Sequence, residues 1–400
     1  MGFSPESDSK FDGRWIAMLF LILYFTAIFV SSFYTDYDQF WADTFRVCTS
    51  RPRFLDMHHL TSGLECHRLG YDVLRQNPCE PNKLPMTYPR IWLNLAALGI
   101  DQSHSDLLGV LCAMLYFLCA FFIAGKLNTI EGIFYGVILC SPSLMLAVET
   151  GNIDLIIFIL LSAALLLIKR NRAFSYLIIF FAAVLKYFPI SALLVAVKER
   201  KRLFWLVGLL IAMFAAYIYF TYDEALLIHS QVQRSTYISF GGFILFRILH
   251  HLTHEVTPLL YWRIAFVGTV GAAIVIAYLQ AARKRTLAHN VDSIDGFRMT
   301  AGIFITSFLL WDNWDYRFIF LVFALPQMWK WIRVKDPLAP ITAAALVGIP
   351  MTLWLSGGCP PEMNFHTIRS FFVDELINWF LFYYFVYALM ATWPYNEKAR

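Results

Sequence analysis

The chain has 400 residues, of which 59% are hydrophobic and only 15% are Asp, Glu, Lys or Arg. A soluble domain of this length cannot bury so much apolar surface. The net charge of +4 at pH 7 is too small to indicate a nucleic-acid partner. These values exclude an ordinary soluble protein and predict an all-α, polytopic membrane protein.

The first long apolar run extends from Trp15 to about Phe33, after a polar N-terminal stretch. It is longer than the apolar core of a typical signal peptide, and no small-residue cleavage site follows it, so we expect a retained first span. Including this run, we expect about ten transmembrane helices. The later candidate spans are Asp106–Ala124, Ile130–Val148, Ile153–Ile168, Leu203–Tyr222, Leu259–Ala282, Phe297–Trp311, Phe318–Trp331, Ile341–Leu355 and Phe371–Thr392.

The apolar segment 173–197 does not fit a single crossing helix. It carries Lys-Tyr-Phe-Pro at 186–189, where the proline breaks a helix and the lysine is costly at mid-depth. Each half has about 12 residues, or roughly 18 Å as helix, which is short against a hydrocarbon core of about 30 Å. Basic clusters flank both ends, at 169–172 and 198–202. We therefore expect a re-entrant hairpin, or two short tilted helices, with Lys186 at its apex.

The distribution of basic residues supports the hairpin. With the N-terminus in the cytoplasm, the cytoplasmic segments collect nineteen of the 32 Lys and Arg residues, as the positive-inside rule requires. The long first outer loop, 34–90, holds seven basic residues against the rule, but it also holds seven acids. We treat residues 1–400 as one integral membrane domain with a second long outer loop at 223–258. The stretch 224–252 in that loop predicts an amphipathic helix in the interface.

Acids, histidines and arginines gather on the predicted outer face, and such convergence on one side of a membrane protein indicates a site. Asp56 lies at the start of a helical pattern in the first outer loop. A carboxylate there can deprotonate a sugar hydroxyl, or it is only an acid favoured in the first turn of a helix. The candidate substrate-binding residues are His58, His59, Tyr88, Arg90, Glu149, Asn152, Asp154, Lys186, Asp315 and Arg317.

Several of these candidates have a purely structural alternative. Arg90 can bind a lipid phosphate or simply snorkel to the interface. Asp154 lies about one turn into a predicted membrane helix, where an acid is a functional candidate by default. Lys186 can meet an anionic headgroup or pair with Asp154 and fix the hairpin. Arg317 can grip a phosphate while Asp315 binds a sugar hydroxyl, or the two side chains can pair with each other at the rim.

The cysteines give no sign of a structural zinc site, because the sequence has no CxxC pair. Cys48, Cys66, Cys79 and Cys359 fall on the predicted outer face. An outer pair such as Cys66–Cys79 can form a disulfide if that compartment is oxidising. The sequence demands no metal and no cofactor, since cationic side chains can carry the charge of a phosphate.

Short motifs follow one another along the chain in a distinctive order. They are Gly70–Leu74, Asn-Pro-Cys-Glu-Pro at 77–81, Tyr-Pro-Arg at 88–90, Gly151–Asp154, Leu185–Pro189 and Asn313–Arg317. Together with the Asp-led helix at Asp56, this order resembles polytopic glycosyltransferases of the type C fold. It is most similar to glycosyltransferase family 87, the polyprenyl-phosphate-mannose-dependent mannosyltransferases. The resemblance covers the chain from Asp56 to Arg317, although Glu-Thr-Gly-Asn at 149–152 departs from the family pattern.

The resemblance implies an enzyme that takes a sugar from a lipid phosphate and passes it to an acceptor on the outer face. We therefore expect a mannose-like hexose to move from a polyprenyl-phosphate sugar to a glycan or glycolipid acceptor. The family's base is an Asp in the first outer loop, which matches Asp56, and the displacement would be inverting. Arg90, Lys186 and Arg317 would hold the donor phosphate.

The other expected partners are membrane lipids, and the expected location is a bacterial plasma membrane rather than the endoplasmic reticulum. The alternative function is a transporter or flippase for a lipid-linked or anionic substrate. A broken helix with a lysine at mid-membrane is also a transporter feature. A transporter, however, needs polar groups along a path to both faces, whereas this sequence keeps its acids on the predicted outer face.

Overall fold

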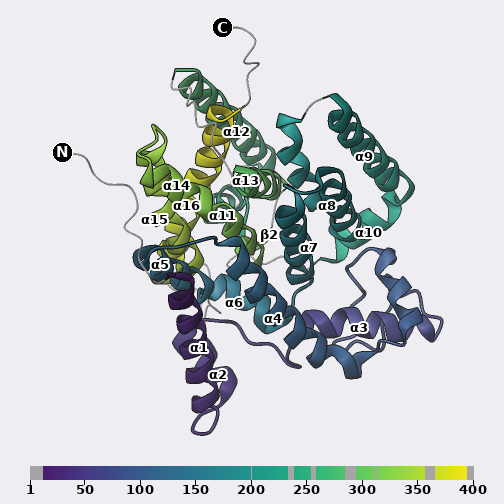
Figure 1. Cartoon of the computed structure of the whole chain (residues 1–400). Helices are drawn as coiled ribbons and strands as arrows, with labels where there is room; N and C mark the ends of the chain where they lie inside the picture. Colours follow the sequence, from purple (N-terminus) through teal and green to yellow (C-terminus); the bar gives the residue numbers. More distant parts are fainter. Residues whose placement is uncertain are drawn as a thin grey trace.

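The computed structural model describes residues 12–199, 201–232, 238–253, 258–283, 294–310, 313–355 and 365–393. Helices dominate these residues, as the sequence predicts (Figure 1). Within them, the two short strands β1 (Ser239–Phe240) and β2 (Asn313–Trp314) form an antiparallel pair. The architecture is therefore all-α, with one strand pair inside the bundle.

Five helices in the described part of the chain contain segments long and apolar enough to cross a membrane. They are α1 (Arg14–Ser31), α4 (Ser105–Ile123), α9 (Lys201–Phe220), α12 (Leu259–Arg283) and α16 (Phe365–Ala391). The pair α5 (Thr129–Leu139) and α6 (Pro142–Thr150) adds a sixth if it forms one bent span. Two shorter apolar helices are α7 (Ile153–Leu167) and α15 (Ala339–Leu355). The total of about ten crossing helices stays a prediction.

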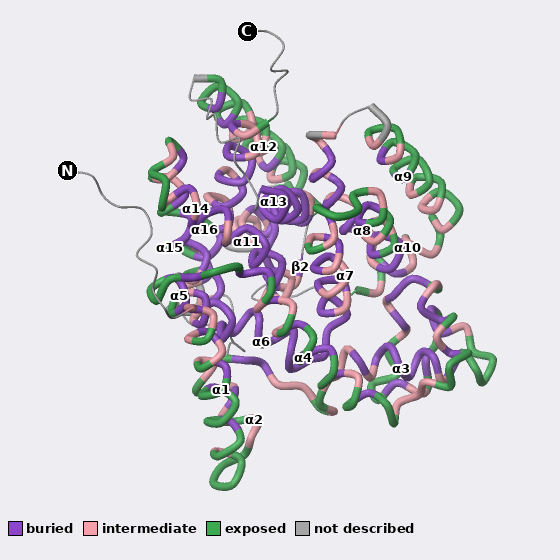
Figure 2. Tube along the Cα trace, in the orientation of Figure 1, coloured by how far each residue is buried: buried purple, intermediate pink, exposed green. Residues whose placement is uncertain are grey.

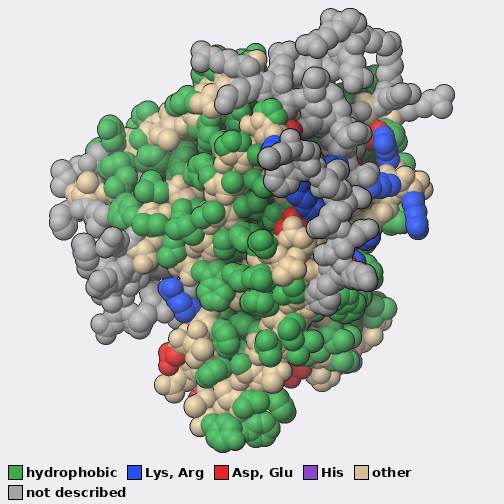
Figure 3. Space-filling model, turned by 60° about the vertical axis from the view of Figure 1, so that its left-hand side comes forward, with side chains coloured by type: hydrophobic (Ala, Val, Ile, Leu, Met, Phe, Trp, Pro, Cys, Tyr) green, Lys and Arg blue, Asp and Glu red, His purple; other side chains and the backbone are tan. Residues whose placement is uncertain are grey.

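The outer surface of the bundle has the character of a membrane protein. Helices α1, α9 and α12 carry large apolar side chains that are well exposed, such as Phe29, Trp205 and Ile264 (Figure 2). In contrast, α13 (Ile294–Leu309) is buried in the middle of the bundle. Hydrophobic side chains cover most of the described surface in the space-filling view (Figure 3). Apolar surface of this extent is stable in lipid and not in water.

Two predicted spans are broken in the structure, in each case for a local reason. The run 130–148 bends by 51° between α5 and α6, where Pro142 begins the second helix. The predicted span 318–331 is divided into η4 (Asp315–Phe323) and α14 (Leu325–Arg333), because Pro326 lies in the first turn of the new helix.

The predicted amphipathic helix over 224–252 is also wrong as one continuous element. The structure has α10 (Tyr222–Gln231), strand β1 and α11 (Ile244–Leu252) there. The backbone of β1 pairs with β2, and the N–H of Gly242 donates to the carbonyl of Phe308 at 2.8 Å. A helix through this segment would lose these long-range hydrogen bonds.

The segment 173–197 folds back on itself at its middle. Helix α8 (Arg172–Lys186) ends at Tyr187, and the 3-10 helix η3 (Phe188–Lys198) returns beside it. The two far ends are tied together, because Glu199 receives the hydroxyl of Tyr176 at 2.6 Å and an Arg172 guanidinium nitrogen at 3.0 Å. Both ends of the segment therefore lie at the same end of the bundle, and Lys186 lies at the turn.

The first long loop has its own structure. It contains α2 (Tyr37–Phe45) and α3 (Leu55–Arg68), and it leads into the 3-10 helices η1 (Arg90–Leu98) and η2 (Gln102–His104). A disulfide joins Cys66 to Cys79, and Cys48 is disulfide-bonded as well. Cys359 lies outside the described residues. Helix α3 lies across the end of the bundle where α6 ends and α7 begins (Figure 1).

Candidate active site

The start of α3 is fixed against the turn between α6 and α7. Phe54, just before the helix, has a left-handed backbone (φ 52°), and its N–H donates to the carbonyl of Glu149 at 3.1 Å. Gly151 ends α6 with φ 60°, and a Cβ at this position would lie 3.0 Å from Cβ of Phe54. A Cβ on Gly109 of α4 would lie 2.4 Å from the Phe54 ring. The two glycines thus make room for Phe54, and this contact brings Asp56 beside the start of α7.

Asn152 links Asp56 to α7. Its Oδ1 caps the helix by accepting the N–H of Asp154 at 2.8 Å, which is the usual role of asparagine at this position. Its Nδ2 donates to Oδ2 of Asp56 at 2.6 Å. Because one end of the amide serves the helix, the other end is directed at the carboxylate. The half-buried Asp56 is also within electrostatic range of Lys186 and Tyr316.

Behind Asn152, one buried carboxylate meets two cations. Asp154 has a side chain that is 0% exposed. Nζ of Lys186 lies 2.7 Å from its Oδ1, and Nε of Arg317 lies 3.6 Å from its Oδ2. Nζ of Lys186 also lies 3.4 Å from Oδ1 of Asn152. We call Asp154, Lys186 and Arg317 the Asp154 cluster. It connects α7, the hairpin turn and η4, which are far apart in the sequence.

Aromatic rings surround the two cations. Nζ of Lys186 lies 5.9 Å from the ring centre of Tyr88 and 5.7 Å from that of Tyr316, within the range of cation–π attraction. The guanidinium of Arg317 lies 4.3 Å from the ring centre of Phe188. The ring of Trp314 stacks on that of Tyr316 at 6.0 Å. Cations bounded by aromatic faces suit a ligand that has both an anionic group and a sugar.

His59 contacts the segment that carries Tyr88. It is buried in α3, and its Nε2 lies 3.2 Å from the N–H of Thr87, which donates to it. Its ring also contacts that of Tyr88 at 5.7 Å. Burial lowers the pKa of His59, although the Asp56 and Glu80 carboxylates oppose the shift. His59 is thus a neutral acceptor that holds the Tyr88 segment in place.

Arg90 does not join the Asp154 cluster, contrary to the expectation that it holds the donor phosphate with Lys186 and Arg317. Its guanidinium lies 2.6 Å from Oδ1 of Asp72 and 3.6 Å from Oε2 of Glu224. Its backbone N–H also donates to Glu224, at 2.8 Å. Two carboxylates from different segments therefore hold Arg90 at the junction of the first loop and α10.

Three other predicted site residues, His58, Glu149 and Asp315, are described by the contacts that each makes. Nε2 of His58 lies 3.6 Å from Asp106 at the start of α4. Glu149 is buried near the end of α6, where its Oε1 accepts the N–H of Ser50 at 2.8 Å. Asp315 is fully buried at the start of η4, and its own N–H donates to the carbonyl of Ile238 at 3.2 Å. Of the eleven predicted site residues, the structure brings together Asp56, His59, Tyr88, Asn152, Asp154, Lys186 and Arg317.

Three residues of this region are not among those predicted from the sequence. Tyr316 faces Lys186, and Asn313 accepts a hydrogen bond from Arg317. Both lie in the same motif as Arg317, so the motif itself was the available signal. The third is Trp92, whose indole N–H donates to the carbonyl of Leu185 at 3.0 Å and ties η1 to the hairpin turn. Nothing in the sequence links these two positions.

These features define a polytopic membrane protein with a carboxylate held beside paired cations at one end of a helical bundle. The model of glycosyltransferase family 87 matches residues 86–297, about half of the chain. The chain therefore belongs to glycosyltransferase family 87, and it is a membrane glycosyltransferase. No curated protein and no solved structure matches it. The matched range includes Asp154 and Lys186, whereas Asp56 and Arg317 lie outside it.

Proposed function

We propose that this enzyme transfers a mannose-like hexose from a polyprenyl-phosphate donor to a glycan or glycolipid acceptor on the extracytoplasmic face. The observation that carries the proposal is the contact from Asp56 through Asn152 to the Asp154 cluster. It combines a carboxylate able to accept a proton with two cations able to hold a phosphate. A sugar bonded to a lipid phosphate needs both groups within one sugar's length of each other.

Lys186 and Arg317 hold the donor phosphate in this proposal. As the bond from the anomeric carbon to the phosphate oxygen breaks, negative charge grows on the phosphate, and fixed cations stabilise that charge. Arg317 offers a planar fork of donors, and Lys186 a compact point charge. Asp154 keeps the two cations close together, since its two oxygens face one cation each.

Asp56 is the general base. It takes the proton of the acceptor hydroxyl while that oxygen forms a bond to the anomeric carbon and the phosphate leaves with the bonding electrons. Asn152 occupies Oδ2 of Asp56, so we assign Oδ1 as the proton acceptor. The acceptor attacks from the side opposite the phosphate, and the configuration at the anomeric carbon is inverted. Membership of a glycosyltransferase family favours this reaction over the transport alternative.

We place the enzyme in a bacterial plasma membrane with α3 on the extracytoplasmic side. The positive-inside count and the pairing of both hairpin ends support this orientation.

The test uses purified enzyme in vesicles supplied with radiolabelled polyprenyl-phosphate mannose, and nuclear magnetic resonance to read the anomeric configuration of the product. We expect transfer from the lipid donor with inversion. Polyprenyl-phosphate glucose in a parallel reaction decides the preference for the sugar. Transfer only from a nucleotide sugar, or a product with retained configuration, would contradict the proposal.

A further inference from the structure

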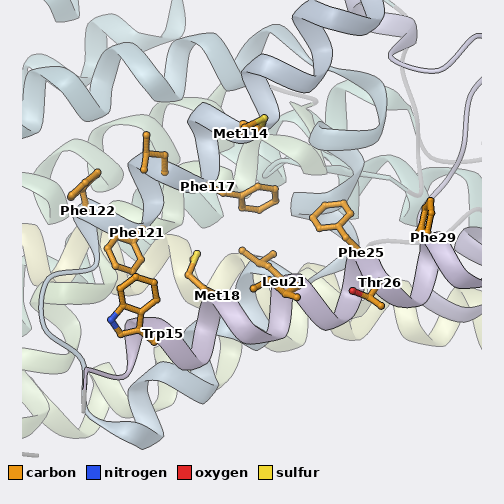
Figure 4. Close-up of a pocket in the computed structure, with 12 residues that line it drawn as sticks. Trp15, Met18, Leu21, Phe25, Thr26, Phe29, Met114, Phe117, Phe121 and Phe122 are labelled. Carbon is orange, nitrogen blue, oxygen red and sulfur yellow. The ribbon is translucent and has the colours of Figure 1, made fainter. Parts of the chain in front are cut away.

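The contacts that hold the candidate active site together lie inside the bundle. On the outside, an apolar groove of about 950 Å³ opens between α1 and α4, with Met18, Phe25 and Phe117 among the residues that line it (Figure 4). The described residues that line this groove include no member of the Asp154 cluster. The position of Lys186 must therefore be set elsewhere, where the first loop meets the hairpin turn.

The end of α8 leaves one backbone carbonyl without a helical partner. In a helix the carbonyl of residue i accepts the N–H of residue i+4, which for Leu185 would be that of Pro189. Proline has no N–H, so a longer helix could not satisfy this carbonyl. Leu185 is buried, and a buried carbonyl that lacks a donor is costly. The carbonyl of Leu185 therefore needs a donor from another segment.

Trp92 supplies that donor from the 3-10 helix η1. Its indole N–H donates to the carbonyl of Leu185 at 3.0 Å, and its side chain is buried. The indole nitrogen can only donate, so it suits a carbonyl that has lost its N–H partner. The carbonyl of Val184, one residue earlier, accepts the hydroxyl of Tyr217 on α9 at 3.3 Å. Two side chains from other elements thus close the end of α8 just before Lys186.

The hydrogen bond from Trp92 joins the segment of Tyr88 to the residue before Lys186. Tyr88 is four residues before Trp92, and its ring centre lies 5.9 Å from Nζ of Lys186. The same Nζ lies 2.7 Å from Oδ1 of Asp154. A displacement of about 1 Å at a catalytic group can cost an enzyme a large part of its rate. Movement of the Leu185 backbone would displace Lys186 by such an amount.

We propose that Trp92 is a positioning residue for the transfer reaction. Its hydrogen bond to Leu185 fixes the hairpin turn, so that Lys186 meets both Asp154 and the donor phosphate. The inference rests on the proposed function where it assigns the phosphate to Lys186. Trp92 acts through Lys186 and needs no contact with the sugar. A purely structural Trp92 would stabilise the fold without changing the environment of Lys186, and this difference can be measured.

The test measures how fast acetic anhydride acetylates Lys186 in the full-length enzyme in vesicles, with mass spectrometry to quantify the product. Trp92→Phe keeps an aromatic ring and removes the donor. The matched control is Trp354→Phe on α15, because the indole N–H of Trp354 also donates to a backbone carbonyl, that of Val137, at 3.2 Å. We expect acetylation of Lys186 to be about tenfold faster in Trp92→Phe, since loss of one hydrogen bond to a buried carbonyl shifts a local equilibrium by about that factor. The rate in Trp354→Phe should equal that of the wild type.

Two results would overturn the inference. They are equal acetylation of Lys186 in the wild type and in Trp92→Phe, and an equal increase in Trp354→Phe. If Trp92→Phe does not fold, 3-benzothienylalanine at position 92 takes its place, because this analogue has the shape of tryptophan and a sulfur instead of the N–H. The same two results then decide.

Polyprenyl phosphate separates this inference from the proposed function. It should protect Lys186 from acetylation in the wild type, and a failure to protect would count against the proposed phosphate site alone, because the variants are compared without lipid. In transfer from polyprenyl-phosphate mannose, the KM for the donor should rise about tenfold in Trp92→Phe and not in Trp354→Phe. An unchanged KM in Trp92→Phe would overturn its role in the reaction.

Discussion

Two aspartates are buried in this bundle with different partners. Asp154 faces two cations, Lys186 and Arg317, beside the half-buried Asp56. Asp374 on α16 lies against a neutral hydroxyl and a neutral amide, from Thr352 on α15 and Asn378 one turn along. Neutral hydrogen bonds suffice to join two helices. A buried ion pair is seldom more stabilising than apolar packing, so the stability of the bundle does not by itself require the ion pairs of Asp154.

The largest expected effect is that of Asp56→Asn. This substitution tests whether the reaction takes place beside Asp154 rather than beside Asp374. The substitution keeps the shape of the side chain and removes its basicity. We expect the transfer rate to fall by about 10² to 10⁴, which is the usual loss for a general base, with expression unchanged. Asp374→Asn is the control and should stay within a few-fold of the wild type. An Asp56→Asn rate within a few-fold of the wild type would remove Asp56 from this role.

The next effect is that of Lys186→Met, which separates a phosphate-binding role from a structural one. If Lys186 binds the donor phosphate, the KM for the donor rises, kcat falls, and kcat/KM drops by about 10²-fold. If Lys186 only neutralises Asp154, the single variant loses thermal stability and the double variant with Asp154→Asn regains both stability and transfer. We expect the double variant to regain stability without transfer.

A smaller effect is expected at the second aspartate. Asp374→Ala removes the neutral contacts between α15 and α16, and we expect the free energy of unfolding to fall by about 1–3 kcal/mol. Transfer per folded molecule should not change, because no group of the Asp154 cluster is touched. Thermal melting in detergent measures the first quantity, and initial rates normalised to folded protein measure the second. A loss of kcat/KM as large as that of Lys186→Met would end the distinction between the two aspartates.

The smallest effect concerns His59 and pH. Burial holds the pKa of His59 below its unfolded value of about 6.5, so the unfolded chain binds more protons than the folded one below that pH. Stability is therefore lost as pH falls from about 6.5 toward the lowered folded pKa. His59→Gln keeps an acceptor for Thr87 and should flatten this part of the melting curve against pH. Equal slopes for the two proteins would contradict a buried, neutral His59.

Much of the fold and part of the candidate site could be predicted from short stretches of the sequence. The long apolar runs at α1, α4 and α12 were predicted within a few residues. The pairing of Lys186 with Asp154 was one of two alternatives that the sequence left open, and the structure contains that pair. An ionisable residue inside an apolar run indicates that a partner exists, since an unpaired charge there is too costly.

The remaining features depend on contacts between distant segments. Arg90 is held partly by Glu224, 134 residues further along the chain, so its neighbours in sequence could not show where its charge would go. Strand β1 forms because its backbone pairs with that of β2. The hydrophobic periodicity within 224–252 cannot reveal a strand that lies outside this segment. The family assignment was predictable because it depends on the order of motifs, and it was confirmed.

Gly109 limits the substitutions that the enzyme tolerates. Gly109 lies on a bilayer-facing helix and carries no reactive group, yet an added methyl would meet the Phe54 ring at 2.4 Å. Phe54 precedes α3, so moving its ring would shift the helix that carries Asp56. If Asp56 is the base that we propose, the rate of transfer depends on how closely Phe54 packs against α4. Inactive variants can therefore be expected among small apolar exchanges at buried positions such as Gly109.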